Sequence, residues 1–184
     1  IVAFVATHLI MRKRFGRGEY PTHPVAEYFY DHYKDVYPRR NISFYSGRNR
    51  LQGYIFGEDN TKGLLVFAHG IHSGHESYIQ EILWMVDHGW RVFAYDATGS
   101  CTSEGWGTTG LIQSALDLHA ALTYVESDES LNRLPVCLMG PTGIGKTEGK
   151  STALPYRSAR SWAGVFRPRR FSLRAISFCP MPCR

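Results

Sequence analysis

Cysteine is scarce in this chain of 184 residues, and histidine is missing from its C-terminal part. Its four cysteines are too few and too scattered for a disulfide framework. The pair Cys179 and Cys183 has a spacing that a metal can use, but no histidine follows His119 and no second pair completes a zinc site. We therefore expect no metal and no cofactor.

Acidic residues are almost missing from the C-terminal part of the chain. Residues 141–184 contain nine Lys and Arg but a single acidic residue, Glu148, whereas residues 1–140 contain 12 Lys and Arg against 15 Asp and Glu. The two parts carry net charges of +8 and −3, which together give the overall +5. The excess of basic residues that gives the chain its pI of about 9.1 therefore lies entirely in the tail. Nucleic-acid-binding domains group basic residues on a folded face, so we expect no nucleic-acid partner.

The apolar stretch at the N-terminus is short. Residues 1–11 are mostly apolar and precede the basic run Arg-Lys-Arg-Phe-Gly-Arg at 12–17, but a helix that crosses a bilayer needs about 20 apolar residues. Two interpretations stay open: the cytoplasmic end of a membrane anchor, or a short amphipathic helix packed on the body. The protein is accordingly expected to be cytoplasmic, or membrane-anchored with its body on either side.

The bulk composition is that of a globular protein. With 43% apolar and 20% charged residues, the chain is long enough for one domain with a sizeable core. We divide it into a membrane-anchor remnant with a basic flank (1–19), a folded body (20–140) and an irregular tail rich in Arg, Pro and Ser (141–184).

The body shows the alternation of strands and helices that is typical of a parallel sheet. Uninterrupted apolar runs predict buried strands at Leu64–Ala68, Arg91–Tyr95 and Pro135–Met139. A hairpin of Asn41–Tyr45 and Leu51–Phe56 precedes them. The fold class is therefore α/β, an incomplete parallel sheet with covering helices.

Two helices separate the predicted buried strands. Helical spacing places them at Glu76–His88, which Gly89 ends, and at Leu111–Val125. The residues expected on one apolar side of the second helix are Ile112, Ala115, Leu116, Leu118, Ala121 and Leu122.

Two loops follow consecutive predicted strands, where chemistry collects in sheets of this kind. The first is the turn His69-Gly70-Ile71, of the sort that directs backbone N–H groups toward an oxyanion. The marker residues of the second are Asp96, Gly99, Ser103 and Gly105. Together these turns resemble the first half of an α/β-hydrolase, in the branch of serine aminopeptidase-like and acylglycerol-lipase-like enzymes, over about residues 40–140. The resemblance implies a serine hydrolase with a small ester or peptide substrate.

Three histidines in the first loop are spaced as metal ligands on a helical turn can be. His69, His72 and His75 nevertheless lie in a Gly/Ser loop with no carboxylate before Glu76. A structural or oxyanion-turn role is therefore favoured over a metal site.

The resemblance implies a Gly-x-Ser-x-Gly turn directly after the third buried strand. Gly140 stands in the right place, but Thr142 occupies the nucleophile position and Ile144 replaces the second glycine. The oxyanion donors would be the N–H groups near Ile71 and of Gly143. An acid and a histidine follow the nucleophile in this fold, whereas residues 143–184 contain no Asp and no His. We therefore expect the triad to be incomplete and the chain to be inactive.

The same segment also satisfies a phosphate-loop pattern. Gly140–Thr147 matches G-x-x-x-x-G-K-[ST] behind a predicted buried strand, so that Gly140, Gly145, Lys146 and Thr147 are candidate phosphate-binding residues. The helix that should follow is interrupted by Gly149 and Pro155, and no later strand ends in an Asp for Mg²⁺. Nucleotide binding is the first alternative function, and a non-catalytic interaction module is the second.

A third interpretation accounts for the changes at Gly140 together. The hydrolase pattern, the charge balance and the apolar periodicity all stop at this residue. A truncation or a shift of the reading frame there would leave the N-terminal part of a hydrolase followed by an arbitrary tail.

Overall fold

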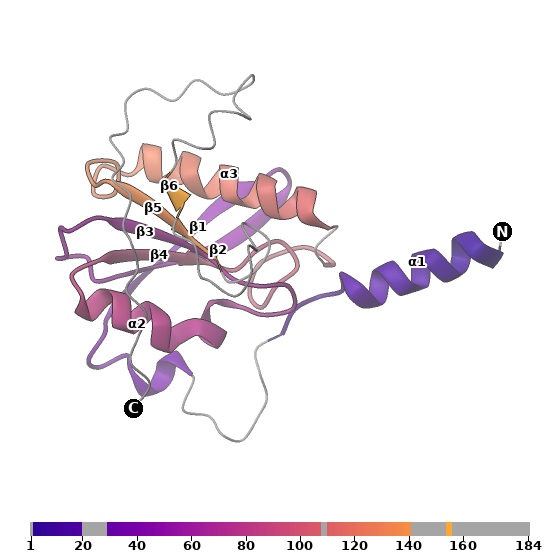
Figure 1. The fold of residues 1–184 in the computed structure, drawn as a ribbon, viewed down its shortest axis with the longest axis horizontal. Helices are drawn as coiled ribbons and strands as arrows, with labels where there is room; N and C mark the ends of the chain where they lie inside the picture. Colours follow the sequence, from indigo (N-terminus) through magenta and orange to yellow (C-terminus); the bar gives the residue numbers. More distant parts are fainter. Residues whose placement is uncertain (1, 20–28, 108–109, 141–153, 156–184) are drawn as a thin grey trace.

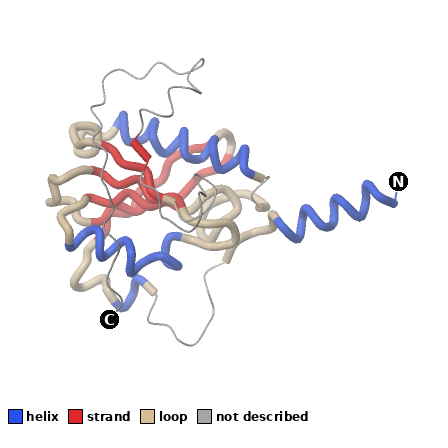
Figure 2. Tube along the Cα trace, viewed as in Figure 1, coloured by secondary structure: helices blue, strands red, loops and turns tan. Residues whose placement is uncertain are grey.

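The computed structural model describes residues 2–19, 29–107, 110–140 and 154–155. In chain order the elements are α1 (Val2–Arg14), the 3-10 turn η1 (Tyr30–His32), β1 (Arg39–Ser46), β2 (Asn49–Phe56), β3 (Leu64–Ala68), the 3-10 turn η2 (His75–Tyr78), α2 (Ile79–Asp87), β4 (Arg91–Tyr95), α3 (Leu111–Ser127), β5 (Val136–Met139) and β6 (Leu154–Pro155). The described strands form one sheet in the order β1-β2-β4-β3-β5-β6, with α2 and α3 on its opposite faces (Figures 1 and 2).

The centre of the sheet is parallel, as the apolar runs predict. Strand β3 pairs in parallel with β4 on one side and with β5 on the other. Every residue of β3 and β4 is buried, because helices cover both faces. The N-terminal hairpin of β1 and β2 is also confirmed, with Gly47 at a φ of 59° in its two-residue turn. Strand β2 also pairs antiparallel with β4, which attaches the hairpin to the central strands.

Two separate hydrophobic cores lie on the two faces of the sheet. On one face, Ile79, Ile82 and Leu83 of α2 pack against alternate strand residues such as Phe67. Ala121 and Val125 of α3 belong to the core on the other face. Successive strand residues point to opposite faces, so each strand supplies side chains to both cores.

The apolar side predicted for α3 is only partly its buried side. The predicted Ala121 is buried and the predicted Leu118 and Leu122 pack against the core, but Ile112 is 78% exposed and Leu116 is 53% exposed. The other buried residues of α3 are Asp117 and Val125, and an apolar pattern cannot indicate a buried acid. The Asp117 carboxylate accepts hydrogen bonds from the backbone N–H of Thr98 at 2.7 Å and from its hydroxyl at 2.8 Å.

Two further boundaries differ from expectation. The first three residues of the predicted helix, Glu76 to Tyr78, belong to the tighter turn η2, so α2 begins at Ile79. In the tail, Leu154–Pro155 pairs with β5 as the short strand β6, where no strand was predicted. The one run of the tail whose sequence favours a strand, Ala175–Phe178, lies outside the described residues.

Helix α1 extends away from the body (Figure 1). Its Val5, Leu9 and Ile10 side chains are 49%, 59% and 60% exposed, so the expectation of a helix packed on the body is wrong. None of the described helices is both long and apolar enough to span a bilayer. The membrane-anchor interpretation stays a prediction.

The buried acid of α3 gives a direct test of which side of the helix faces the sheet. We expect Asp117→Ala to lower the free energy of unfolding by about 2 to 4 kcal/mol, because it leaves the buried Thr98 donors without an acceptor. Ile112→Gln should change it by less than about 0.5 kcal/mol. Urea denaturation followed by circular dichroism measures both. The reverse order would mean that the predicted side is the buried one.

Candidate active site

The ends of three parallel strands meet at one edge of the sheet. Phe67 of β3 pairs with Met139 of β5, and Ala68 pairs with Tyr95 of β4. The residues that follow these strands therefore start next to one another. They are the turn from His69 to Ile71, the loop from Asp96 to Gly107, and Gly140. This edge is where α/β sheets place their sites.

The side chain of His69 links the first two of these segments. Its Nε2 accepts a hydrogen bond from the backbone N–H of Ala97 at 2.9 Å, and its Nδ1 donates to the carbonyl oxygen of Gly70 at 2.7 Å. Both bonds form only if the ring is neutral with its hydrogen on Nδ1. Burial lowers the pKa of this ring below its ordinary value, which favours the neutral form. His69 therefore fixes the turn and is not free to act as a base.

The turn aims one backbone N–H group away from itself. The Gly70 carbonyl oxygen accepts hydrogen bonds from His69, from the Ser73 hydroxyl at 2.7 Å and from the Ser73 N–H at 3.3 Å. A planar trans peptide directs its C=O and N–H in opposite directions, so the Ile71 N–H points away from these donors. Among the described residues, none accepts a hydrogen bond from it. The Ile71 N–H therefore stays a candidate oxyanion donor, as the turn predicts.

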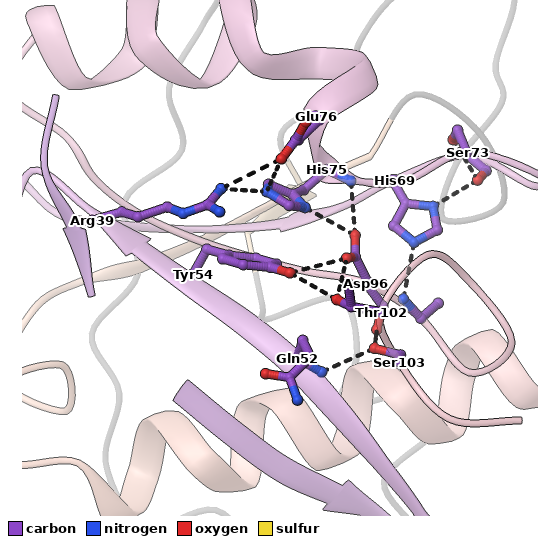
Figure 3. A network of polar contacts seen from close by, with 12 residues as sticks. Arg39, Gln52, Tyr54, His69, Ser73, His75, Glu76, Asp96, Thr102 and Ser103 are labelled. Carbon is purple, nitrogen blue, oxygen red and sulfur yellow. Dashed lines mark hydrogen bonds and ion pairs between the residues drawn. The ribbon is translucent and has the colours of Figure 1, made fainter. Parts of the chain in front are cut away.

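Asp96 is buried at the end of β4 and holds several segments together (Figure 3). Its Oδ1 accepts hydrogen bonds from both the backbone N–H and the Nδ1–H of His75, each at 2.9 Å. Its Oδ2 accepts from the Tyr54 hydroxyl at 3.3 Å and from the Thr102 hydroxyl at 3.4 Å. Burial acts to raise the pKa of this carboxyl, but the hydrogen bonds from His75 outweigh it and lower that pKa to about 2.

His75 and Asp96 form an acid–histidine pair that substrate cannot reach. The His75 ring is fully buried and stacks on Tyr54 with 3.7 Å between ring centroids. Its Nε2 faces the Arg39 guanidinium at 2.8 Å, and a guanidinium can only donate. Arg39 in turn lies over the Tyr30 ring and 3.9 Å from Glu76. Both ring nitrogens of His75 are occupied, so the pair stabilises the fold.

The marker residues of the second loop have structural roles. The buried Ser103 hydroxyl donates to the carbonyl oxygen of Asp96 at 2.5 Å and accepts from the Gln52 N–H at 2.9 Å. Gly99 has a φ of 72°, and a Cβ there would overlap the backbone of Gly107. The loop therefore folds tightly on itself and onto β2, and Ser103 is not available as a nucleophile.

Sequence reasoning missed a contact between the N-terminal segment and this loop. The Arg17 guanidinium donates to the carbonyl oxygens of Cys101 at 2.5 Å, Ser103 at 2.9 Å and Gly105 at 2.8 Å. The Gly18 backbone pairs with the same loop, since its carbonyl oxygen accepts from the Cys101 N–H at 2.8 Å. We call Arg17 and Gly18 the clasp. Arg17, which the sequence placed in a basic flank, is thus attached to the body.

The remaining predicted residues are placed only in part. Gly140 is half-buried directly after β5. The nucleophile position Thr142, the oxyanion candidate Gly143 and the phosphate-loop residues Gly145, Lys146 and Thr147 lie outside the described residues. Within the described part of the chain, no three His, Cys, Asp or Glu side chains form a cluster that fits a metal ion.

Comparison with known proteins gives a fold. No family profile and no curated protein matches the sequence. An α/β-hydrolase from Vibrio vulnificus is similar in structure, with a TM-score of 0.55 and 17% identity over 72% of this chain and 46% of that one. A Pyrococcus furiosus esterase has a TM-score of 0.54 and 16% identity over 68% of this chain and 48% of that one. The body has the α/β-hydrolase fold. The chain spans just under half the length of these two hydrolases.

The resemblance inferred from the two turns is confirmed for the fold. The narrower assignment to the serine aminopeptidase-like and acylglycerol-lipase-like branch stays a prediction. In an α/β-hydrolase the nucleophile turn follows the strand that β5 represents, next to the turn after β3.

The pairing of Asp96 with His75 should make the free energy of unfolding depend on pH under acidic conditions. The carboxyl binds its proton more weakly in the folded state, with a pKa of about 2 against an ordinary value of 3.8. This contribution, about 2 kcal/mol, is present above pH 4 or so and is lost as the pH falls toward about 2. Asp96→Asn should lack this loss, whereas Asp59→Asn, at an exposed carboxylate, should keep it.

The measurement is urea denaturation of the three proteins between about pH 2 and pH 6. If Asp96→Asn loses stability over this range as steeply as the parent, Asp96 is not the group responsible.

Proposed function

We propose that this chain is part of a serine-hydrolase-type protein for small esters or peptides, and that the 184 residues are inactive as they stand. The observation that carries the proposal is the Ile71 N–H, which points away from a turn whose carbonyl is held by three donors. That turn lies beside the end of β5, where this fold carries its nucleophile.

The chemistry would follow the usual course of acyl transfer. A hydroxyl after β5 attacks the substrate carbonyl, and the N–H groups of Ile71 and of Gly143 stabilise the oxyanion. The hydroxyl needs a base to take its proton. His69 and His75 are already engaged on both ring nitrogens, and no histidine follows His119. Glu148 is the single acidic residue after Thr142, so the proposed inactivity rests above all on the lack of a histidine to act as base after the nucleophile position.

Nucleotide binding is the competing proposal. The phosphate-loop pattern from Gly140 to Thr147 comes directly after β5, which is a buried strand as this motif requires. Lys146 and Thr147 would contact the phosphates and Mg²⁺. A third proposal, a non-catalytic interaction module, retains the hydrolase body without either chemistry.

A nucleophile probe tests the inactivity. The purified chain is treated with a fluorophosphonate probe and assayed with p-nitrophenyl butyrate, beside the variant Thr142→Ala. We expect no labelling and no turnover above the variant, because nothing activates the Thr142 hydroxyl. Labelling over time that Thr142→Ala abolishes would refute the proposed inactivity.

A thermal-shift assay tests the nucleotide alternative. We expect the melting temperature to stay unchanged with ATP or GTP in the presence of Mg²⁺. Lys146→Ala is the test variant and Lys150→Ala its matched control. A rise in melting temperature that Lys146→Ala abolishes and Lys150→Ala retains would establish nucleotide binding in place of the hydrolase proposal.

A further inference from the structure

Helix α1 carries large apolar side chains that the body does not cover. Val5, Leu9 and Ile10 are each about half exposed or more, and the helix leaves the body on the side of the loop from Asp96 to Gly107 (Figure 1). Exposed apolar side chains gathered on one element are typical of a surface that binds a membrane or another protein.

The order of residues in α1 indicates how that surface is used. Between Val2 and Met11 only Thr7 and His8 are polar, and the last turn then reads Arg12-Lys13-Arg14. The apolar part has no polar side, so it does not match a helix that lies flat on a membrane. It fits insertion along the helix axis into the hydrocarbon, with the basic turn among the headgroups.

The clasp fixes where α1 leaves the body. Arg17 holds three carbonyl oxygens of the loop, and the backbones pack directly, since a Cβ at Gly107 would overlap the Phe15 carbonyl oxygen. Gly18 also lies against the first turn, because a Cβ there would be 3.1 Å from the backbone carbonyl carbon of His72. The base of the helix is thus joined to both loops.

Two further apolar side chains are exposed next to this base. Trp106, the residue before Gly107, is 94% exposed. Ile71, the residue before His72, is 43% exposed. Tryptophan is enriched where proteins meet the headgroup region of a bilayer, because its ring is apolar and its N–H is polar. These two residues and α1 form what we call the lipid-facing rim.

We propose that the lipid-facing rim binds an anionic lipid bilayer, with α1 in the hydrocarbon and Trp106 at the headgroups. The basic turn of α1 complements anionic lipid. Glu104, an acidic residue beside the clasp, is paired with Arg50. Its carboxylate lies 3.8 Å from the Arg50 guanidinium and accepts a hydrogen bond from the Arg50 backbone N–H at 2.9 Å. The binding does not depend on whether the active site is complete.

Vesicle sedimentation tests the proposal on the 184-residue chain. We expect about tenfold more protein to pellet with phosphatidylcholine vesicles containing about one third phosphatidylserine than with phosphatidylcholine alone, and added salt to reduce the difference. Leu9→Gln with Ile10→Gln should reduce the binding at least about tenfold. Ile112→Gln with Leu116→Gln, the matched control at two exposed apolar residues of α3, should bind as the parent does.

Tryptophan fluorescence tests the role of the rim. Emission should shift to shorter wavelength when anionic vesicles are added, and Trp106→Phe should remove most of that shift. An unchanged shift in Trp106→Phe would overturn the placement of Trp106 at the headgroups.

Three results would overturn the lipid proposal as a whole. They are no pelleting with anionic vesicles, an equal loss of binding in the Ile112/Leu116 control, and a dimer in analytical ultracentrifugation that Leu9→Gln with Ile10→Gln disperses while vesicles bind nothing. The last result would mean that α1 meets a second copy of the chain.

Discussion

The buried Asp96 carboxylate is the interaction on which the arrangement of the site edge depends. It lies at the end of β4 and accepts hydrogen bonds from η2, from β2 and from its own loop through His75, Tyr54 and Thr102. A buried charge is costly unless it is paired and hydrogen-bonded, so this carboxylate requires all of these partners in place. Ser103 adds a bond to the Asp96 backbone. The loop and the first turn are thereby held in one fixed relation to the sheet.

This constraint also decides which histidines are free for chemistry. One ring nitrogen of His75 is hydrogen-bonded to Asp96, and the other faces the Arg39 guanidinium. The ring of His69 is hydrogen-bonded to the backbones of Gly70 and Ala97. Both are part of the scaffold that presents the Ile71 N–H. In α/β-hydrolases the base comes from a segment beyond the strand that β5 represents. The proposal of an inactive chain therefore concerns the residues after β5, whereas the turn with the Ile71 N–H is part of the described body.

The sequence predicted those parts of the fold that local patterns determine. Buried parallel strands are uninterrupted apolar runs, so β3 and β4 were located to the residue, and the two turns after them indicated the fold. Contacts between distant residues left no such pattern. The bonds of Arg17 to Cys101, the pairing of His75 with Asp96 and the buried acid Asp117 each join segments that nothing in their local sequence connects. The buried side of α3 was predicted only in part, because the buried Asp117 belongs to it and an apolar pattern cannot indicate a charged residue.

The central claim is that the edge formed by β3, β4 and β5 belongs to a serine hydrolase whose pattern breaks off at Gly140. Sequencing the coding DNA and translating all three frames downstream of the Met139 codon tests this claim most directly. The account predicts that an alternative frame encodes Gly-x-Ser-x-Gly within the first few codons, followed later by an acid and a histidine. If no alternative frame encodes such a turn, the frame-shift account is contradicted, and the phosphate-loop pattern becomes the better explanation of the residues after β5.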